Sequence, residues 1–447
     1  MAKKQTLHIG LDDTDSTKGG CTTYLAAVLV GKLQEFKVEY TDYPRLIRLN
    51  PNIPWKTRGN GALCLSFKFN TNQEKYIKKV ALNLWKTQAA VDQNGTDPGI
   101  VFYRGSRIPR KVKQFSKKAE TGVVSINEAI SLAKEIGAEA HGFNSCRGII
   151  GSLAAIGETL EDDYTYELIA YRTEENLGTK RQVNTESIIE MDKETCPFTY
   201  NNVDSETGRI IITPRGPDPI LFGIRGETPL IVKKAFNVVK SVEPIERWII
   251  FRSNQGTDAH LTRVNELSKL QPYSSVITKG VVSKNPRIVP LRHVIFSIED
   301  NTAEIDCAAY EPTGNLRKIA RELTVGDNIE VYGAVNKATK SKPLTINLEK
   351  IKILNLSEKV STENPSCPTC GKHLKSLGKD QGYGCKKCGN KYPKSFKTRK
   401  NVSRSLKPGL YFTSERSQRH LTKPLRRYGQ EKSHVIYYPL IADWHFP

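Results

Sequence analysis

Apolar positions in residues 1–103 fall into short continuous runs that are separated by longer mixed stretches. The runs are bounded by polar turns, which predicts strands at residues 6–11, 38–49, 62–69 and 100–103. The mixed stretches predict helices at about residues 21–36 and 73–90. The resulting order, strand-helix-strand-strand-helix-strand, is that of a ferredoxin-like layer.

A second α/β segment is predicted at about residues 195–255. Its strands are expected at residues 209–213, 220–224 and 248–251, and its helix at residues 228–239. Between the two segments, residues 125–136 have a helical pattern and residues 164–171 a strand pattern. We therefore expect an α/β architecture in the N-terminal half of the chain.

The pattern changes at residues 274–353, where short strands follow one another closely. Strands are predicted at residues 276–282, 293–298, 303–309, 328–335 and 344–354, with a short helix at residues 315–322. This order is that of an OB-fold barrel, which binds single-stranded nucleic acid by backbone charge and base stacking. The candidate contacts are Lys279, Arg287, Arg292, Tyr310 and Lys337. The alternative is an OB-fold that serves only as a spacer.

Composition narrows the class of partner. The chain has 447 residues, with 68 Lys and Arg against 47 Asp and Glu, a formal net charge of +21 and a pI near 9.4. This charge predicts attraction to a polyanion, nucleic acid first and an anionic membrane second. No apolar run approaches the roughly 20 residues of a spanning helix, and acids interrupt the first strand too early for a signal peptide. We expect a soluble, cytoplasmic protein without membrane contact and with about three domains.

Four of the nine cysteines predict a metal site. They form two CxxC pairs separated by fourteen residues: Cys367, Cys370, Cys385 and Cys388. The odd total and the paired spacing favour a metal in a reducing compartment over disulfides. Four thiolates at this spacing fit tetrahedral Zn²⁺ with no open position, and Gly371 and Gly389 supply the turns that follow each pair. We therefore expect a structural zinc ribbon at residues 363–395.

The segment after the ribbon is strongly basic. Residues 391–432 contain thirteen Lys and Arg against two acids, with Tyr411, Phe412 and Tyr428 interleaved. This mixture suits phosphate contacts combined with base stacking. We expect a nucleic-acid-binding tail at residues 396–447; the alternative is a charged tail that is only solvated.

Three carboxylates follow the first strand: Asp12, Asp13 and Asp15. Carboxylates this crowded repel one another unless a cation lies among them, and Mg²⁺ takes one or two carboxylates together with substrate phosphates. The next residues, with Gly19, Gly20 and Thr23, open a helix whose free N–H groups attract phosphate. The pattern predicts a Mg-nucleotide site without a Walker A sequence. The alternative is a polar turn with a helix cap.

A basic loop at residues 45–61 follows the second predicted strand. It contains Arg48, Lys56 and Arg58. Cations at this density suit a triphosphate or an RNA backbone. The alternative is a solvated loop between two strands.

Four long motifs resemble a known family. They are GLDDTDSTKGGCTTY from Gly10, PRLIRLNPNIPWKTRGNG from Pro44, GFNSCRGIIGSLAAIG from Gly142 and YNNVDSETGRIIITPRGPDPILFGIRGE from Tyr200. The chain resembles the archaeal 2-agmatinylcytidine synthetases, which act on the AUA-decoding isoleucine tRNA. The resemblance covers nearly the whole chain, and the OB-fold and the zinc ribbon follow in that family's order.

The resemblance implies a multidomain α/β fold, kinase-like plus ferredoxin-like, followed by an OB-fold barrel and a zinc ribbon. We expect these domains at residues 1–170, 171–262, 274–355 and 363–395, with the first two able to interleave, and a tRNA-binding tail at residues 396–447. It further implies a ligase that uses ATP, Mg²⁺ and agmatine. Agmatine would replace the C2 oxo group of the wobble cytidine in a CAU anticodon, so that the isoleucine tRNA reads AUA.

The resemblance also implies roles for single residues. Asp12, Asp13 and Asp15 would hold Mg-ATP, and a threonine that is phosphorylated in the family corresponds to Thr22. Phosphorylation of cytidine O2 would create a leaving group for the amine of agmatine, and phosphoryl transfer depends on positioning and charge neutralisation. Candidates that bind ATP or the flipped base are Gly19, Gly20, Thr23, Arg48, Lys56, Arg58, His141, Asn144, Ser145 and Arg147. Candidates for the agmatine guanidinium are Asp204, Glu206 and Asp218.

Two other classes of function remain open. A Mg²⁺-dependent nuclease would use the acid cluster to activate water and would cleave RNA without ATP. A non-enzymatic RNA-binding protein would need only the OB-fold, the ribbon and the tail, and alanine at Asp12 and Asp13 would then change nothing but stability. The helix start at residues 19–23 and the match along the chain disfavour both.

Overall fold

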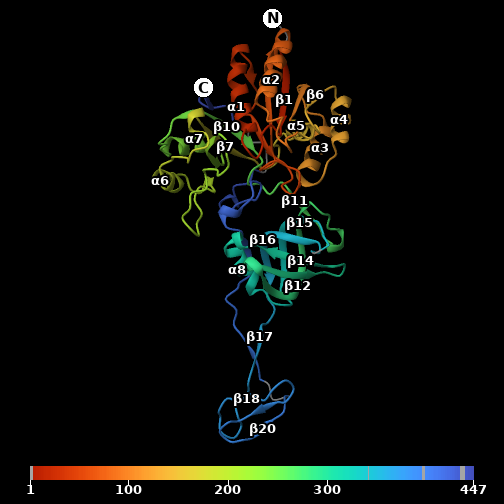
Figure 1. Cartoon of the computed structure of the whole chain (residues 1–447), viewed down its shortest axis with the longest axis vertical. Coiled ribbons are helices and arrows are strands. Elements are labelled where there is room, and N and C mark those ends of the chain that lie inside the picture. The colour runs from red at the N-terminus through yellow and green to blue at the C-terminus, as the bar shows by residue number, and fades with distance from the viewer. Residues whose placement is uncertain (1–3, 341, 395–397, 433–437) are drawn as a thin grey trace.

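The computed structural model describes residues 4–340, 342–394, 398–432 and 438–447. A large α/β body, a β-barrel and a small ribbon follow one another along the long axis of the molecule (Figure 1). The chain then returns past the barrel to the α/β body, where its last strand joins the sheet. Parts of the predicted domains, at residues 1–3, 341, 395–397 and 433–437, lie outside the described residues.

One sheet forms the centre of the α/β body, in the order β6-β5-β1-β4-β3-β10-β7-β9-β8, with β2 beside β4 and β23 beside β10. Its strands are β1 (Lys4–Asp12), β2 (Glu39–Tyr40), β3 (Arg45–Arg48), β4 (Gly61–Asn70), β5 (Gly99–Arg104), β6 (Glu139–Gly142), β7 (Thr165–Arg172), β8 (Thr199–Tyr200), β9 (Ile220–Gly226), β10 (Ile245–Ser253) and β23 (His445–Phe446). The strands of the two predicted α/β segments meet where β3 runs parallel to β10. The two segments therefore share one continuous sheet.

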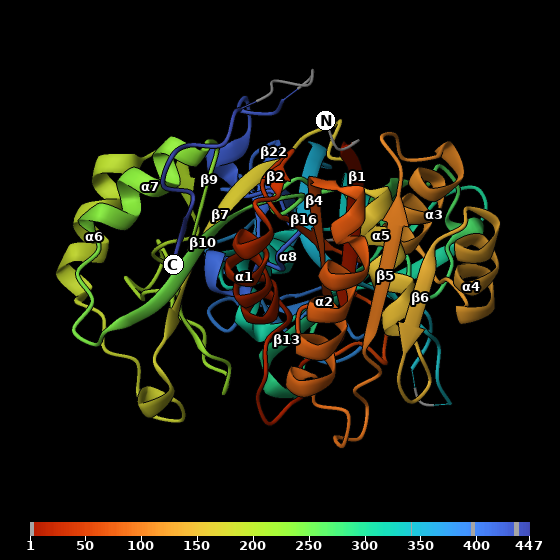
Figure 2. The same ribbon diagram turned by 90° about the horizontal axis from the view of Figure 1, so that it is seen from above.

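Helices cover both faces of this sheet. They are α1 (Thr22–Leu33), α2 (Glu74–Gln88), α3 (Arg110–Thr121), α4 (Ile126–Glu135), α5 (Gly148–Gly157), α6 (Thr185–Thr195) and α7 (Pro229–Val238). Leu7, Ile9 and Leu11 of β1 are fully buried on one face, whereas Gly10 faces α5, because alternate strand residues point to opposite sides. Helices α1 and α2 pack over β4 and β5, α3 and α4 pack on α5, and α7 packs on β7 and β9 (Figure 2).

Glycines let α5 approach the sheet at backbone contact distance. A Cβ on Gly10 would lie 2.1 Å from the carbonyl oxygen of Ser152, and a Cβ on Gly151 would lie 1.9 Å from a carboxylate oxygen of Asp12. Atoms packed at interior density leave no room for an added carbon at these distances. The end of β1 and its first carboxylate are therefore held directly against α5.

The barrel is an OB-fold. Its elements are β11 (Leu261–Arg263), β12 (Ser275–Val289), β13 (His293–Glu299), β14 (Glu304–Ala309), α8 (Asn315–Glu322), β15 (Asn328–Asn336) and β16 (Thr345–Asn355). Strand β12 pairs with β13 and β15, and β14 pairs with β16, which closes the barrel around its own apolar core. The five predicted strands and the predicted helix are all present, so the prediction of an OB-fold is confirmed.

The ribbon is an excursion from the barrel. Strand β17 (Val360–Glu363) pairs with β21 (Thr398–Asn401) in a stalk, and β18 (Lys375–Ser376), β19 (Tyr383–Gly384) and β20 (Lys391–Tyr392) form a small sheet at its tip. After the stalk, β22 (Gly409–Phe412) pairs with β16 and extends the barrel sheet. The ribbon is therefore inserted between two strands of the barrel sheet.

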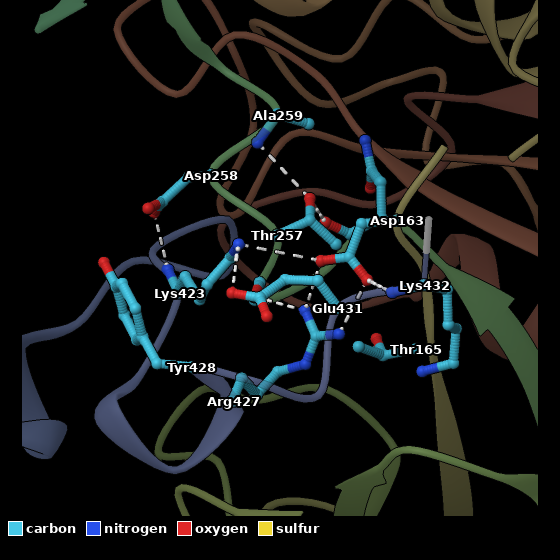
Figure 3. Close-up of polar contacts among 12 residues, drawn as sticks. Asp163, Thr165, Thr257, Asp258, Ala259, Lys423, Arg427, Tyr428, Glu431 and Lys432 are labelled. Carbon is cyan, nitrogen blue, oxygen red and sulfur yellow. Dashed lines mark hydrogen bonds and ion pairs between the residues drawn. The ribbon is translucent and has the colours of Figure 1, made fainter. Parts of the chain in front are cut away.

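Residues 404–432, which we call the strap, cross from the barrel onto the α/β body. Seven of the eight Lys and Arg side chains in the strap form ion pairs with carboxylates. Figure 3 shows the contact in which the buried guanidinium of Arg427 lies 2.8 Å from Asp163, and the same guanidinium lies 2.6 Å from Glu227. The strap, which is part of the predicted basic tail, is thus a packed segment in which most of the positive charges are paired. Its contact with RNA remains a prediction.

The structure differs from the sequence prediction in several places, including the following two. Residues 209–213, predicted as a strand, form a loop that is held by single bonds, such as the one from Ile211 N–H to the carbonyl oxygen of Asn202 at 2.9 Å. The basic stretch after residue 104 contains helix α3, which was not predicted. Its Val112 and Phe115 are buried while its cations face outward, so the high charge concealed an amphipathic pattern.

Replacement of Gly10 by alanine should destabilise the protein by about 3 kcal/mol, because the new Cβ would overlap the backbone of α5. Gly31→Ala in α1 is the matched control, since its Cβ would meet nothing closer than 3.8 Å. The control should be neutral or more stable by up to about 1 kcal/mol. Thermal and urea unfolding of both variants would measure the difference, and equal stabilities would contradict the close packing of α5.

Candidate active site

The end of β1 opens into a pocket that we call the acidic pocket. It is lined by Asp12, Asp13, Asp15, Lys56, Thr57 and Arg147. The hydroxyl of Thr57 donates to one carboxylate oxygen of Asp13 at 2.7 Å, and the backbone N–H of Asp97 donates to the other at 2.8 Å. Arg147 in turn donates to the side chain of Asp97 at 2.9 Å. The structure therefore brings the three predicted carboxylates together, and hydrogen bonds from Thr57 and Asp97 hold the side chain of Asp13 in place.

Burial raises the pKa of all three carboxylates in the acidic pocket. The pKa of Asp12 lies well above its usual value, because of burial first and the charge of Asp13 second. The pKa of Asp15 is raised by burial to about 6, although the charge of Arg58 opposes this. A cluster of this kind gains free energy from a nearby cation. Mg²⁺ typically takes one or two carboxylates and receives further ligands from substrate phosphates.

The other wall of the acidic pocket is apolar. It is formed by Ile53, Trp55, Val123, Val124 and Ile150. Trp55 packs edge-on against Tyr273 at a centroid distance of 6.3 Å. A pocket lined by both charged groups and apolar side chains matches the two parts of a nucleotide, its phosphates and its base.

A second pocket adjoins the first, and we call it the mixed pocket because both signs of charge line it. Its carboxylates and cations are Asp15, Glu167, Asp218, Glu415, Arg48, Arg58, Arg225 and Arg416. Its apolar lining is Ile169, Ile211, Ile212 and Ile220. Asp15 lines both pockets, so the two meet at its carboxylate.

The loop after β1 also brings two threonines to the mixed pocket. Thr22 is the first residue of α1, and its hydroxyl oxygen accepts a hydrogen bond from the hydroxyl of Thr14 at 3.1 Å. Thr23 lines the same pocket. Gly20 lies in the loop with a φ of +79°, which favours glycine, and its own added Cβ would lie 3.3 Å from the Cα of Asp15. One short loop thus presents carboxylates to the acidic pocket and hydroxyls to the mixed pocket.

Arg58 connects the loop to the far side of the mixed pocket. Its guanidinium lies 3.4 Å from the carboxylate of Asp15 and 3.5 Å from that of Asp218. It also donates to the backbone carbonyl of Ser16 at 2.7 Å. The predicted cation Arg58 therefore holds the acid loop against the segment that carries Asp218.

Several charged or titratable residues of the mixed pocket were missed by the sequence analysis, among them Glu167, Arg225 and His420. Glu167 on β7 accepts hydrogen bonds from Arg225 at 3.0 Å and from Gln255 at 2.5 Å. Burial alone would raise the pKa of Glu167, but the charges of Arg225 and Arg48 lower it overall. His420 of the strap accepts at Nδ1 from Arg225 at 2.9 Å, and burial together with the charges of Arg48 and Arg225 depresses its pKa well below the usual value.

Seven predicted site residues lie outside the lining of both pockets: Gly19, Gly20, His141, Asn144, Ser145, Asp204 and Glu206. His141 lies 2.8 Å from Glu139 on the same strand, and Asn144 donates to two backbone carbonyls in a tight turn. Asp204 and Glu206 form ion pairs with Arg416 at 2.9 and 3.2 Å. These two acids therefore hold a strap residue that lines the mixed pocket, instead of lining it themselves.

The four predicted metal ligands converge at the tip of the ribbon. One sulfur atom from each of Cys367, Cys370, Cys385 and Cys388 lies within 4.8 Å of the others. The sulfurs of Cys370 and Cys385 are 3.5 Å apart, close to the edge of about 3.8 Å that tetrahedral Zn–S bonds give. Gly371 and Gly389 have φ of +70° and +74°, and each donates its N–H to the carbonyl of the first cysteine of its pair. The donor set and the turns fit a closed zinc site.

Comparison with family models assigns most of the chain to four domains. The TiaS TCKD domain matches residues 8–145, the TiaS FLD domain residues 146–260, an OB-fold nucleic acid binding domain residues 268–354 and the TiaS C-terminal zinc ribbon domain residues 364–406. The isoleucine-tRNA 2-agmatinylcytidine synthetase TiaS of Methanosarcina mazei is 43% identical over 426 residues, which cover 94% of this chain and 97% of that protein. The chain belongs to the TiaS family.

Solved TiaS structures share this fold over nearly the whole chain. A crystal structure of TiaS in complex with its isoleucine tRNA and ATP has a TM-score of 0.85 and 39% identity, and it covers 95% of this chain and 97% of its own. A complex of TiaS with the same tRNA, AMPCPP and agmatine has a TM-score of 0.82 and 37% identity, with the same coverage. The predicted family and fold class are confirmed. Every helix in the described ranges is too short or too polar to cross a membrane.

Replacement of Asp15 by asparagine should stabilise the nucleotide-free protein at neutral pH. Because the pKa of Asp15 is raised to about 6 from 3.8, the native state loses stability as the pH rises from about 4 to 6 and the carboxylate ionises. Removal of this penalty is worth roughly 3 kcal/mol at most. Melting temperatures of both proteins between pH 4.5 and 8 would measure it. A difference that does not shrink as the pH falls below 6 would contradict the burial of this charge.

The ribbon should carry one zinc ion per chain, and Cys388→Ser should lose it, as elemental analysis would show. Because the ribbon is joined to the barrel only by its stalk, chelation should expose the ribbon to protease without lowering the melting temperature of the α/β body. Joint melting of both parts would contradict this independence. Serine at the buried Cys307 of the barrel is the control that should keep the zinc.

Proposed function

We propose that this chain is an ATP-dependent ligase that joins agmatine to C2 of the wobble cytidine of an isoleucine tRNA, so that the tRNA reads AUA. The observation that carries the proposal is the pair of pockets that meet at Asp15. One pocket suits a nucleotide and the other suits a base together with a guanidinium compound. TiaS complexes have been solved with the isoleucine tRNA and ATP and, separately, with that tRNA, AMPCPP and agmatine.

ATP belongs in the acidic pocket. Mg²⁺ would lie between its phosphates and the carboxylates of Asp12, Asp13 and Asp15, where it would neutralise charges that burial makes costly. Lys56 and Arg147 supply positive charge to the phosphates, and the apolar wall receives the base. The protein's part in such a transfer is positioning and neutralisation.

The wobble cytidine and agmatine belong in the mixed pocket. Agmatine is cationic at its guanidinium end, and Asp218, Glu167 and Glu415 offer carboxylates there. The isoleucine side chains give its butyl chain an apolar wall. Of the three carboxylates that the sequence suggested for agmatine, Asp218 is the one that lines the mixed pocket.

Phosphoryl transfer connects the two pockets. A phosphoryl group passed from ATP to cytidine O2 leaves with that oxygen when the amine of agmatine attacks C2, so the C–O bond breaks as the C–N bond forms. Thr22 is the residue for the phosphorylation that the family resemblance implies, and it lies on the loop whose acids line the ATP pocket. Asp15 reaches both pockets and is the residue that would couple them.

The remaining domains would hold the tRNA. The OB-fold candidates are Lys279, Arg287, Arg292, Tyr310 and Lys337, and the CAU anticodon would be the part presented to the mixed pocket. The domain limits at residues 170 and 262 remain predictions, since one sheet spans both domains. We expect the enzyme to meet a tRNA substrate in the cytoplasm.

Purified protein with a CAU-anticodon isoleucine tRNA transcript, Mg-ATP and radiolabelled agmatine should transfer label into the RNA. Thr22→Ala and Asp12→Ala should each lose at least 100-fold in rate, because each removes a group from the transfer path. Lys111→Gln, an exposed residue on α3, is the control that should retain the wild-type rate. Tight tRNA binding without incorporation would indicate a binding protein, and shortened RNA would indicate a nuclease.

A further inference from the structure

A third cavity, which we call the basic pocket, adjoins the mixed pocket and has a volume of about 250 Å³. Its charged and titratable lining consists of Arg48, Lys56, Arg58, Arg419 and His420. Among the residues that the structure describes, no carboxylate lines it. Concave surfaces lined by one sign of charge concentrate ligands of the opposite sign.

Two of these cations lack the ion pairs that neutralise most of the strap. Within the described ranges, neither Arg48 nor Lys56 forms an ion pair with a carboxylate, whereas Arg58 and Arg419 each lie within reach of one. Burial lowers the pKa of Arg48 to about 10, and burial together with the charge of Arg419 lowers that of Lys56. Buried positive charges without an ion-pair partner are stabilised by a bound anion.

Two nitrogen atoms converge on one point of the basic pocket. A Cβ on Gly59 would lie 2.9 Å from Nη1 of Arg48 and 2.9 Å from Nε2 of His420. Nδ1 of His420 lies 2.9 Å from Arg225 and 3.1 Å from the amide oxygen of Gln255. Because a guanidinium can only donate, the shorter contact assigns the acceptor role to Nδ1 and the proton to Nε2, which is then a donor. The absence of a side chain at Gly59 leaves both donors open to the same ligand.

The pocket is also held in place from two sides. Arg419 and His420 belong to the strap, and the backbone of Gly256 donates to the carbonyl of His420 at 2.8 Å. Seven residues further along, Arg427 fixes the strap to Asp163, as Figure 3 shows. The other wall is the loop at residues 48–59, so the donors are positioned before any ligand binds.

We propose that the basic pocket binds a phosphate group, and that this phosphate is the RNA phosphodiester next to the nucleotide in the mixed pocket. Arginine, lysine and an imidazole N–H are the donors that phosphate oxygens accept from. The inference rests on the proposed function, because it takes the nucleotide in the mixed pocket as the wobble cytidine. The proposal adds a contact to the RNA backbone that would determine which nucleotide enters the mixed pocket.

The position of the pocket favours RNA over ATP as the source of the phosphate. It shares Arg48, Arg58, Gly59 and His420 with the mixed pocket, whereas it shares only Leu49 and Lys56 with the acidic pocket. It also lies at the junction with the barrel, where the side chain of Arg419 lies 3.8 Å from Glu349 on β16. RNA held by the barrel would pass this junction on its way to the mixed pocket.

The test begins with wild-type protein and altered RNA. tRNA transcripts assembled from two halves would carry one uncharged methylphosphonate linkage, either directly 5′ or 3′ of the wobble nucleotide or, as a control, in the acceptor stem. We expect the KM for tRNA to rise about tenfold for one of the two wobble linkages, the scale of a charge-assisted hydrogen bond, and to stay unchanged for the control. Equal KM values for all three RNAs would overturn the proposal.

The second step combines these RNAs with protein variants. Arg419→Gln should raise the KM for normal tRNA, and the sensitive methylphosphonate should then add nothing, because this change removes one side of the same contact. Gly59→Ala should have the same effect without a change of charge, since its Cβ fills the point where the donors converge. Arg104→Gln, an exposed residue on β5 that is paired with Glu74, is the matched control and should keep the full tenfold response.

The outcomes separate this proposal from the proposed function. If the variants raise the KM for ATP and the methylphosphonate effect remains additive, the phosphate belongs to ATP and the RNA assignment is wrong. If wild-type protein incorporates no agmatine into normal tRNA, the proposed function fails. In that case the same RNAs and variants in equilibrium binding still decide whether the basic pocket holds an RNA phosphate.

Discussion

Helix α5 lies against β1 at a distance that only glycine permits, and the candidate active site depends on that contact. Gly10 removes the side chain that would separate the strand from Ser152, and Gly151 removes the one that would displace Asp12. The carboxylate of Asp12 is thereby pressed into a low-dielectric wall, which raises its pKa. The close packing of α5 on β1 thus also makes the ionised carboxylate at the end of β1 unfavourable unless a cation lies near it.

Because the strap contributes to the mixed pocket, this pocket is lined by residues from both ends and the middle of the chain. The mixed pocket takes Asp15 and Thr22 from the first residues, Glu167 and Arg225 from the middle and His420 from near the end. The OB-fold and the ribbon lie between the middle part and the strap in sequence. Strand β22, which precedes the strap residues of the mixed pocket, pairs with β16 of the barrel, so the barrel and the mixed pocket are connected through the strap.

Local signals in the sequence predicted most of the fold and about half of the site. Alternation and turn residues placed the barrel strands well, and fixed spacing identified the zinc ligands, because both signals act over a few neighbouring residues. Glu167 and His420 carried no such signal, since their partners lie at Gln255 and Arg225, far away along the chain. His141 shows the converse error: it lies near a matching motif in sequence, but its strand directs it to Glu139 outside both pockets.

Contacts between residues that are distant in sequence also determine how much of the net positive charge is free to bind an anion. The sequence located the surplus of Lys and Arg after the ribbon, but in the strap these cations are largely neutralised by acids from the α/β body and the barrel, as Arg427 is by Asp163 and Glu227. Such pairs hold segments together and have little charge left for phosphate. Within the described ranges, Arg48 and Lys56 form no ion pair with a carboxylate, and both line the basic pocket. The state of pairing, more than the number of positive residues, therefore indicates where this protein meets the RNA backbone.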